Sequence, residues 1–341
     1  MNKFEKLLGT EYRFLDEDAR LGDNIHLLVY GGSKAYGTNL PTSDTDIRGI
    51  ATNTAENILL GNDFEVFTNE ATDTVIYSVD KIFGLLSSCN PNTIEILFVR
   101  DEDIIYMDDI GKMIRESRDI FLSNKCIGTF GGYANQQLYR LQQKTLSALS
   151  DEEYNKHIAK TIAGMNEHLI ANYGLNPIEI SSEKDGLYAH IKETTCSVDI
   201  FSNLLNEINN VIREYNKRSD RNEKALTHNK INKHAMHLVR LYLMAIELLT
   251  TGTVCTYRSV EHQLLMDIRT GKYSTENGQM NTEFFELVKE LENSFDKAKM
   301  HSKLPDKPDF TAINELRALI NWNTITFEKK KQRSLSEKES R

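Results

Sequence analysis

Short apolar runs bounded by turn residues recur through the first third of the chain. Runs of this length, rich in Ile, Val, Phe and Tyr, are typical of β-strands. The strands that they predict are Asn24–Tyr30, Asp44–Thr52, Phe64–Thr68, Thr74–Val79 and Ile104–Met107. In the second strand, the alternation of side chains puts Asp44 and Asp46 on one face. The sequence NEAT between the third and fourth strands predicts a hairpin.

Capping residues mark short helices between these strands. Ser33 is expected to begin a helical turn, and Ser78 to cap a helix that runs through Ser88. Pro91 stands where the first turn of a helix tolerates proline. Residues 2–20 predict a short amphipathic helix followed by a loop. Strands mixed with a few helices predict an α+β fold, with a mixed-sheet domain over residues 1–110.

From about Asp108 the spacing of apolar residues becomes helical. The helices that it predicts are Ile110–Leu122, Ile127–Leu149, Asp151–Asn172, Ser197–Lys217, Lys230–Thr250, Val260–Ile268, Thr282–Met300 and Phe310–Ile320. Gly252 is placed to end the helix before it, and Leu175–Thr195 is expected to hold a short hairpin. These elements predict a helical substrate-binding domain over residues 111–327. The charged segment 328–341 predicts a disordered tail.

Composition indicates an ordinary globular protein. Of the 341 residues, 40% are hydrophobic and 27% charged. No apolar run approaches the length of a membrane span, and the N-terminal residues lack the apolar region of a signal peptide. The four cysteines lie far apart, which argues against a zinc site or a disulfide framework and favours a reducing compartment. We therefore expect a cytoplasmic protein with no membrane partner.

Charge is distributed unevenly along the chain. The net charge of −9 does not suggest a general nucleic-acid binder. The first third is acidic, however, and Ile212–Arg240 is locally basic. This combination suits a polyanionic substrate held through divalent cations, although solvated charged faces would give the same pattern.

One stretch, GGSKAYGTNLPTSDTDIRGI, concentrates the residues that can carry chemistry. Backbone N–H groups of Gly31, Gly32 and Ser33 can cradle a phosphate. Asp44 and Asp46 repel each other unless cations lie between them, and Mg²⁺ prefers carboxylate and phosphate oxygens. The stretch therefore predicts a nucleoside-triphosphate (NTP) site that binds Mg²⁺ or Mn²⁺ and supports a two-metal displacement.

Simpler explanations exist for the same residues. Ser33 is also a good helix cap, and Asp44 and Asp46 are also typical of a turn. Arg48 lies two residues beyond Asp46 and either contacts the triphosphate or neutralises the acidic cluster. The chain has no Walker sequence G-x-x-x-x-G-K-[ST], and no Ser-His-Asp or Cys-His nucleophile arrangement is apparent.

The pattern G-G-S followed by S-D-x-D resembles the signature of the DNA polymerase β nucleotidyltransferase superfamily. Its longer form, GSxAYG(T)xxxxSDxDxRG, is similar to that of a subfamily named for RNA repair and often encoded beside RNA ligases. Later segments also resemble that subfamily: NPNTIEILF (90–98), GGYANQQLYRL (131–141), KHAMHLVRLYLMAIELLTTG (233–252), DIRTGKYS (267–274) and LPDKPD (304–309). The resemblance spans roughly residues 24–320 and implies a mixed-sheet catalytic domain with a helical domain packed behind it.

The resemblance also implies roles for individual residues. The turn that begins at Gly31 would bind nucleotide, with Gly32 and Ser33 on the β- and γ-phosphates. Asp44 and Asp46 would bind two magnesium ions.

A third carboxylate, on a neighbouring strand, would also bind metal and help to activate the attacking hydroxyl. We choose Asp73 for this role because it directly precedes the β-rich TVIYSV, with Glu70 and Asp80 as alternatives.

The helix expected at Lys230–Thr250 carries several basic residues at spacings of three and four, which would form one stripe. They are Lys230, Lys233, His234, His237 and Arg240. We expect Lys233 and Arg240 to contact phosphate, because the resembling segment centres there; a solvated basic face is the alternative. Tyr36 is expected to stack on a base or to pack. Further candidates for substrate contact are Tyr133, Gln137 and Arg140.

Together these features predict a metal-dependent nucleotidyltransferase that moves NMP from an NTP to an acceptor hydroxyl. The acceptor implied by the resemblance is an RNA 3′ end, such as that of a tRNA-like molecule. A protein side chain or a small molecule is the alternative acceptor, which the isoelectric point of about 5.6 favours slightly. A catalytically silent module that binds nucleotide or RNA is the remaining hypothesis.

Overall fold

A computed structural model gives the structure of the chain. It describes residues 3–147 apart from Glu5, Leu8 and Asp63, residues 178–191 apart from Lys184 and Asp185, and residues 228–339 apart from 276–278. Between 148 and 227 it otherwise describes only isolated positions. The helices expected at Asp151–Asn172 and Ser197–Lys217 lie outside the described residues.

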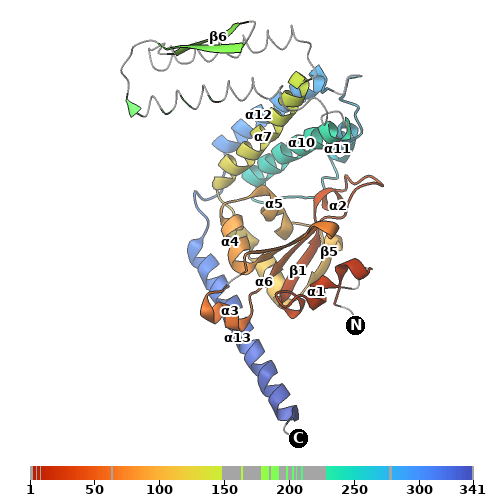
Figure 1. The fold of residues 1–341 in the computed structure, drawn as a ribbon, viewed down its shortest axis with the longest axis vertical. Helices are drawn as coiled ribbons and strands as arrows, with labels where there is room; N and C mark the ends of the chain where they lie inside the picture. Colours follow the sequence, from red (N-terminus) through yellow and green to blue (C-terminus); the bar gives the residue numbers. More distant parts are fainter. Residues whose placement is uncertain are drawn as a thin grey trace.

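A mixed five-stranded sheet forms the N-terminal half (Figure 1). Its strands are β1 (Ile25–Tyr30), β2 (Ile47–Ala51), β3 (Val66–Asn69), β4 (Thr74–Ser78) and β5 (Ile104–Met107). The strand order is β3-β4-β2-β1-β5, in which β2 and β4 are parallel and the other pairs are antiparallel. All the predicted strands are therefore present, and β3 and β4 form the predicted hairpin.

Strand β2 begins later than the alternation of side chains predicts. It starts at Ile47, which pairs with Tyr30, the last residue of β1. The glycine pair Gly31–Gly32 follows Tyr30 and ends β1, so the ladder between β1 and β2 ends at the Tyr30–Ile47 pair. Asp44 and Asp46 therefore lie before β2. The prediction that both carboxylates share a strand face is therefore wrong, although Asp46 stays attached to the sheet because its carbonyl accepts the Gly31 N–H at 2.9 Å.

Short helices connect the strands, and two of them begin where Ser78 and Pro91 predict, whereas the turn expected to begin at Ser33 begins at Gly32. The short helices are α1 (Phe14–Glu17), α2 (Gly32–Tyr36), α3 (Ala55–Leu60), α4 (Val79–Ser87), α5 (Pro91–Ile94) and α6 (Asp109–Glu116). The Ser78 hydroxyl accepts the Lys81 N–H at 3.2 Å, and Pro91 opens α5 as expected. Near the N-terminus, a 3-10 turn at Thr10–Tyr12 and the four-residue α1 replace the predicted amphipathic helix.

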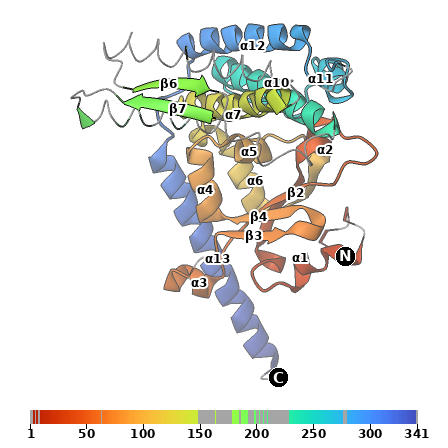
Figure 2. The ribbon, with the colours of Figure 1, turned by 45° about the horizontal axis from the view of Figure 1, so that its top comes forward.

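Longer helices dominate the second half. They are α7 (Lys125–Ser147), α10 (His228–Thr251), α11 (His262–Arg269), α12 (Thr282–Met300) and α13 (Phe310–Glu339). Figure 2 shows α7, α10 and α12 stacked on the side of α5 that faces away from the sheet. Gly252 follows α10 with φ 73°, and the predicted hairpin is formed by β6 (Ile178–Glu183) and β7 (Gly186–Ile191). None of the helices in the described ranges is both long and apolar enough to cross a membrane.

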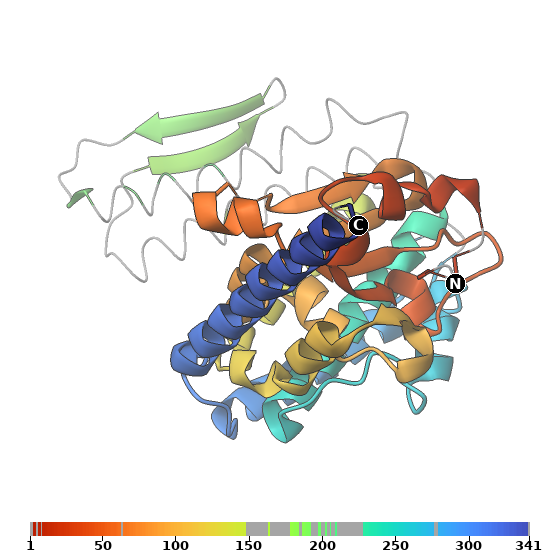
Figure 3. The ribbon, with the colours of Figure 1, turned by 90° about the horizontal axis from the view of Figure 1, so that it is seen from below.

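Helix α13 differs from its prediction in length and in position. It continues to Glu339, through the segment expected to be a disordered tail, because Glu, Lys, Gln and Arg are good helix formers. It also returns to the N-terminal half and runs past α3 and α4 (Figure 3). There Arg317 donates to Asp80 at 3.3 Å and Glu328 accepts the Ala55 N–H at 3.2 Å. The sheet half therefore includes a segment from the end of the chain.

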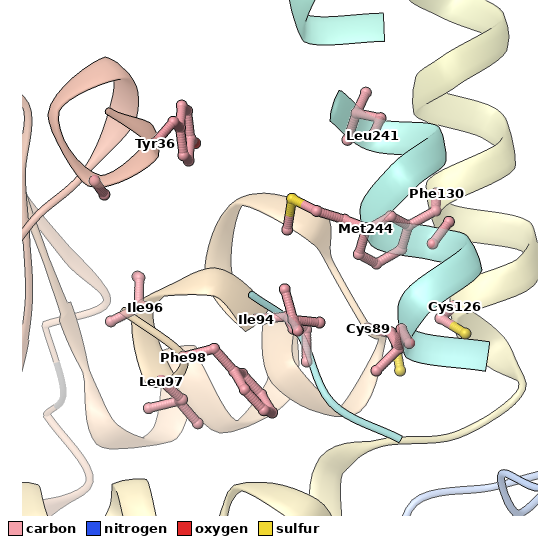
Figure 4. Close-up of a cluster of buried hydrophobic side chains, with 14 of the residues drawn as sticks. Tyr36, Cys89, Ile94, Ile96, Leu97, Phe98, Cys126, Phe130, Leu241 and Met244 are labelled. Atoms are coloured by element: carbon pink, nitrogen blue, oxygen red, sulfur yellow. The ribbon is translucent and has the colours of Figure 1, made fainter. Parts of the chain in front are cut away.

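The hydrophobic core lies on both faces of the sheet. One face packs on the N-terminal helices, around Leu28, Ile47 and Ile76. The other face packs on α4 and α5, and from there the same cluster of buried side chains continues into α7 and α10 (Figure 4). Because this cluster is continuous, side-chain packing fixes the helical half against the sheet.

Candidate active site

The turn after β1 brings a glycine against a carboxylate. Gly31 is the N-cap of α2, and Gly32 has φ 54°, a left-handed conformation that favours glycine. A Cβ atom on Gly32 would lie 1.8 Å from Asp46 Oδ2. The predicted phosphate-binding turn and the predicted metal ligand are therefore in direct contact, and only glycine leaves room for it.

Parallel pairing of β2 and β4 brings a second carboxylate to the same place. Ile47 pairs with Thr74, so the residues that precede these two strands, Asp46 and Asp73, lie side by side. Asp73 has φ 43°, a left-handed conformation that aspartate tolerates better than most residues. Its carbonyl accepts the Ile47 N–H at 3.1 Å, which fixes the turn to the start of β2.

The two alternatives to Asp73 lie elsewhere. Asp80 is on α4, where it pairs with Arg317 at 3.3 Å. Glu70 is exposed at the start of the 3-10 turn Glu70–Thr72. Of the three carboxylates considered, Asp73 is the one that contacts the Arg48 and Asp46 pair.

Arg48 joins the two carboxylates. Its guanidinium donates to Asp46 Oδ1 at 3.1 Å, to the Asp73 carbonyl at 2.7 Å and to Asp73 Oδ1 at 3.4 Å. This is the arrangement expected of a residue that neutralises the acidic cluster. A contact of Arg48 with the triphosphate stays a prediction.

Burial and proximity change the acidity of Asp46. Burial and a hydrogen bond with Asp73 raise the pKa of Asp46 to about 6, against the opposing charges of Arg48 and Lys233. Asp46 and Asp73 are a suitable pair of ligands for a divalent cation, which would remove the repulsion between them. Lys233 is exposed on α10, and its influence on Asp46 indicates that it faces the site from the helical half.

Asp44 stands apart from this pair. It is exposed in the loop before β2. Within the described parts of the chain, no three His, Cys, Asp or Glu side chains come together as a metal-binding group. The carboxylates that already lie together are therefore Asp46 and Asp73, and Asp44, two residues before Asp46 in an exposed loop, stays a predicted third ligand.

Arg240, expected on a phosphate, is instead fully buried between the two halves. Its Nη1 lies 2.9 Å from Glu95 Oε2 and its Nη2 lies 3.0 Å from His237 Nδ1. Its guanidinium carbon lies 3.6 Å from the ring centroid of Tyr36, whose hydroxyl donates to Glu95 Oε1 at 2.5 Å. The charge of Arg240 is thus engaged within the protein, and Tyr36 packs instead of facing open solvent.

Sequence reasoning missed Glu95 in this cluster. The residue lies in NPNTIEILF, a segment used only as a sign of family resemblance. Glu95 stands among apolar residues in this segment, and a carboxylate that is buried there needs a polar partner. Its position could therefore have indicated a buried ion pair. The partner, Arg240, lies 145 residues away, so its identity was not deducible from local spacing.

The remaining candidates make contacts within the helical half or beside it. His234 Nδ1 lies 3.0 Å from Oε1 of the buried Gln137. The Tyr133 hydroxyl accepts from Asn90 at 3.4 Å. The side chains of Lys230 and Arg140 lie outside the described part of the structure.

Comparisons with known proteins identify the family of the chain. A model of the RNA repair pathway DNA polymerase beta family matches residues 13–319. An uncharacterized 38.9 kDa protein of Enterobacteria phage T4 is 29% identical over 137 residues, which cover 36% of this chain and 40% of that protein. The chain thus spans less than half the length of that relative. No solved structure matches the chain. The match over most of its length shows that the chain belongs to the RNA repair pathway DNA polymerase beta family.

Proposed function

We propose that the protein is a metal-dependent nucleotidyltransferase that transfers NMP from an NTP to an acceptor hydroxyl. The observation that carries the proposal is the contact between Gly32 and Asp46, with Asp73 alongside. The backbone of the turn at Gly32 can bind a phosphate, and the Asp46 and Asp73 carboxylates can bind a cation. A metal-bound triphosphate requires these two kinds of group side by side. Membership of the family supports the same class of reaction.

Different residues bind the phosphates and the metal ions. Gly31, Gly32 and Ser33 hold the β- and γ-phosphates, and Lys233 supplies positive charge from the helical half. Asp44, Asp46 and Asp73 would hold Mg²⁺ or Mn²⁺, which would supply charge neutralisation at the phosphates.

On the acceptor side, Asp73 orients the attacking hydroxyl. Arg48 fixes the orientation of Asp46 and Asp73 through its hydrogen bonds to both. The attack on the α-phosphorus releases pyrophosphate toward Ser33.

The favoured acceptor is an RNA 3′ end, which the family's description supports. Transfer to a protein side chain or a small molecule is the second candidate. A transfer screen separates them: the protein is incubated with Mg²⁺, each of the four α-labelled NTPs, and either total RNA or a cell lysate. We expect label in RNA together with release of pyrophosphate. Label that appears only in protein bands would overturn the RNA acceptor.

The double variant Asp44→Ala, Asp46→Ala tests whether the site is catalytic. We expect it to lose transfer completely, because it removes two of the three proposed metal ligands. The surface variant Asp296→Ala is the control and should transfer like the wild type, because Asp296 lies on α12, where it pairs with Lys299 at 2.6 Å. An inert wild-type protein that still binds NTP would instead indicate a silent binding module.

A further inference from the structure

A buried polar cluster lies between the two elements that carry the proposed nucleotide contacts. Tyr36 comes from α2, Glu95 from the 3-10 turn Glu95–Leu97, and His237 and Arg240 from α10. Both oxygens of Glu95 are used: Oε1 accepts from Tyr36 at 2.5 Å and Oε2 from Arg240 at 2.9 Å. Figure 4 shows the Tyr36 ring directed from its helical turn toward α10, which carries Leu241 and Met244.

The two ends of this cluster lead to the nucleotide site. Tyr36 ends the same five-residue helix that begins with Gly32 and Ser33. Lys233 lies seven residues before Arg240 on α10, which is two helical turns and therefore the same side of the helix. A displacement at Glu95 would thus change the distance between the phosphate-binding turn and Lys233.

Stability alone is a poor explanation for such a cluster. The Arg240 side chain is 1% exposed and that of Glu95 is 12% exposed. Taking two charges out of water costs about as much as their attraction returns, and well-packed apolar residues often replace such a pair without loss. Hydrogen bonds of fixed geometry, however, hold the groups that make them in one orientation.

Burial also keeps Tyr36 protonated. Burial raises the pKa of Tyr36 well above 10. The phenol therefore stays protonated and donates a hydrogen bond to Glu95. The Arg240 guanidinium bonds to Glu95, His237 and Met244 Sδ, and its buried Nε has no hydrogen-bond partner within the described residues. Because Arg240 is fully buried, we do not expect it to contact substrate directly.

We propose that Glu95 and Arg240 are positioning residues for the triphosphate. Glu95 holds α2 through the Tyr36 hydroxyl and holds α10 through Arg240, and in this way sets the span between Ser33 and Lys233. This inference rests on the proposed function, since it assigns the residues that align the two sides of the same site.

The test compares two tyrosine variants that lose the same hydroxyl. Tyr36→Phe removes the bond to Glu95, and Tyr242→Phe removes a similar bond from α10 to Glu292, at 3.1 Å, within the helical half. Equilibrium binding of each of the four Mg²⁺–NTPs is measured, together with thermal unfolding. We expect Tyr36→Phe to weaken binding of the preferred NTP by roughly 3- to 10-fold, as the loss of one hydrogen bond would. Tyr242→Phe should bind NTP like the wild type, although its loss of thermal stability should be similar to that of Tyr36→Phe.

A second variant separates positioning from folding. Glu95→Gln alone leaves Arg240 buried without a counter-charge and should unfold at lower temperature. The double variant Glu95→Gln, Arg240→Met removes both charges, so its unfolding temperature should recover while NTP binding stays weak. Recovery of binding together with stability would show that the pair is merely structural and would overturn the inference.

The outcomes also distinguish this inference from the proposed function. A wild-type protein that binds none of the four NTPs would overturn both. A wild-type protein that binds and transfers, with Tyr36→Phe and Tyr242→Phe indistinguishable from it in NTP affinity, would overturn the inference alone. A loss in Tyr36→Phe that is not additive with that of Lys233→Met would support a shared effect on the triphosphate.

Discussion

The candidate site depends on close contacts between a few residues that strand pairing brings together. Gly32 and Asp46 meet because the Tyr30–Ile47 pair ends the antiparallel ladder, and Asp73 joins them because β4 runs parallel to β2. The glycines and Asp46 were recognisable from spacing. Asp73 is chosen because it directly precedes the strand TVIYSV, but its place beside Asp46 follows from the parallel pairing of β2 and β4, which no local pattern specifies.

Replacement of Asp73 tests its assignment as the third carboxylate. Asn keeps nearly the same shape and tolerates the left-handed conformation, so Asp73→Asn should fold normally while losing its charge. We expect kcat for nucleotidyl transfer to fall about 100-fold or more, as for the loss of a group that assists proton transfer. The measurement is steady-state transfer with circular dichroism as a check of folding.

Glu70→Gln provides the matched control for this variant. Glu70 lies three residues earlier on the same turn and is exposed. Its replacement should leave kcat within about twofold, since isolated surface changes have small effects. If Glu70→Gln abolished transfer while Asp73→Asn retained it, the third carboxylate would have to be reassigned.

At the scale of elements, local signals predicted where helices begin better than where they end. Ser78 and Pro91 mark helix starts because a cap bonds to residues only three positions away. The start of β2, by contrast, depends on its pairing with β1. The segment after Glu328 has the composition of a disordered tail, yet it also has high helix propensity, and it continues a helix that Ile313, Leu316 and Ile320 anchor.

Helix α6 shows how a cap also connects an element to the sheet. Asp108 accepts the Gly111 N–H at 2.9 Å and bonds to Nδ1 of His26, on β1, at 2.7 Å. A Cβ atom on Gly111 would lie 2.1 Å from the His26 carbonyl, so the helix packs directly on the strand. The remaining nitrogen of His26 lies 2.9 Å from the Thr52 hydroxyl.

This cap makes stability depend on pH. Burial opposes the charge of Asp108, but the hydrogen bond and charge of His26, helped by Gly111 and Lys3, lower the pKa of Asp108 below 3.8. A carboxyl whose pKa is lower in the folded state stabilises the fold above its unfolded pKa and loses that contribution as the pH falls through its folded pKa. Asn caps helices as well as Asp does, so Asp108→Asn keeps the cap but removes the charge and the oxygen that faces His26 Nδ1.

We therefore expect Asp108→Asn to lower the free energy of unfolding by about 1 kcal/mol at neutral pH. The difference from the wild type should shrink as the pH falls below 3.8. Denaturant unfolding between pH 7 and the acid range measures it. Asp109→Asn, exposed in the same turn, should change stability by about 0.5 kcal/mol or less. A difference that stayed constant with pH would contradict the role of the Asp108 charge.

At the scale of the whole molecule, the two halves share one core and the chain crosses between them more than once. The division at residue 110 that the sequence pattern predicts follows the change from strands to helices. Packing does not follow it, because α6 lies on β1 and α13 returns to α3 and α4. Periodicity identifies which face of a helix is apolar, but it does not identify the surface that covers that face.

The return of α13 can be tested with two neighbouring residues. Ile320 is fully buried in the shared core, whereas Leu319 is 46% exposed on the same helix. Ile320→Ala should lower the free energy of unfolding by about 2–4 kcal/mol, because it removes buried methyl groups and leaves a cavity. Leu319→Ala should change it by less than about 1 kcal/mol, since alanine favours helix and little apolar surface is lost. Urea unfolding followed by circular dichroism measures both. Equal effects of the two variants would contradict the packing of α13 against the N-terminal half.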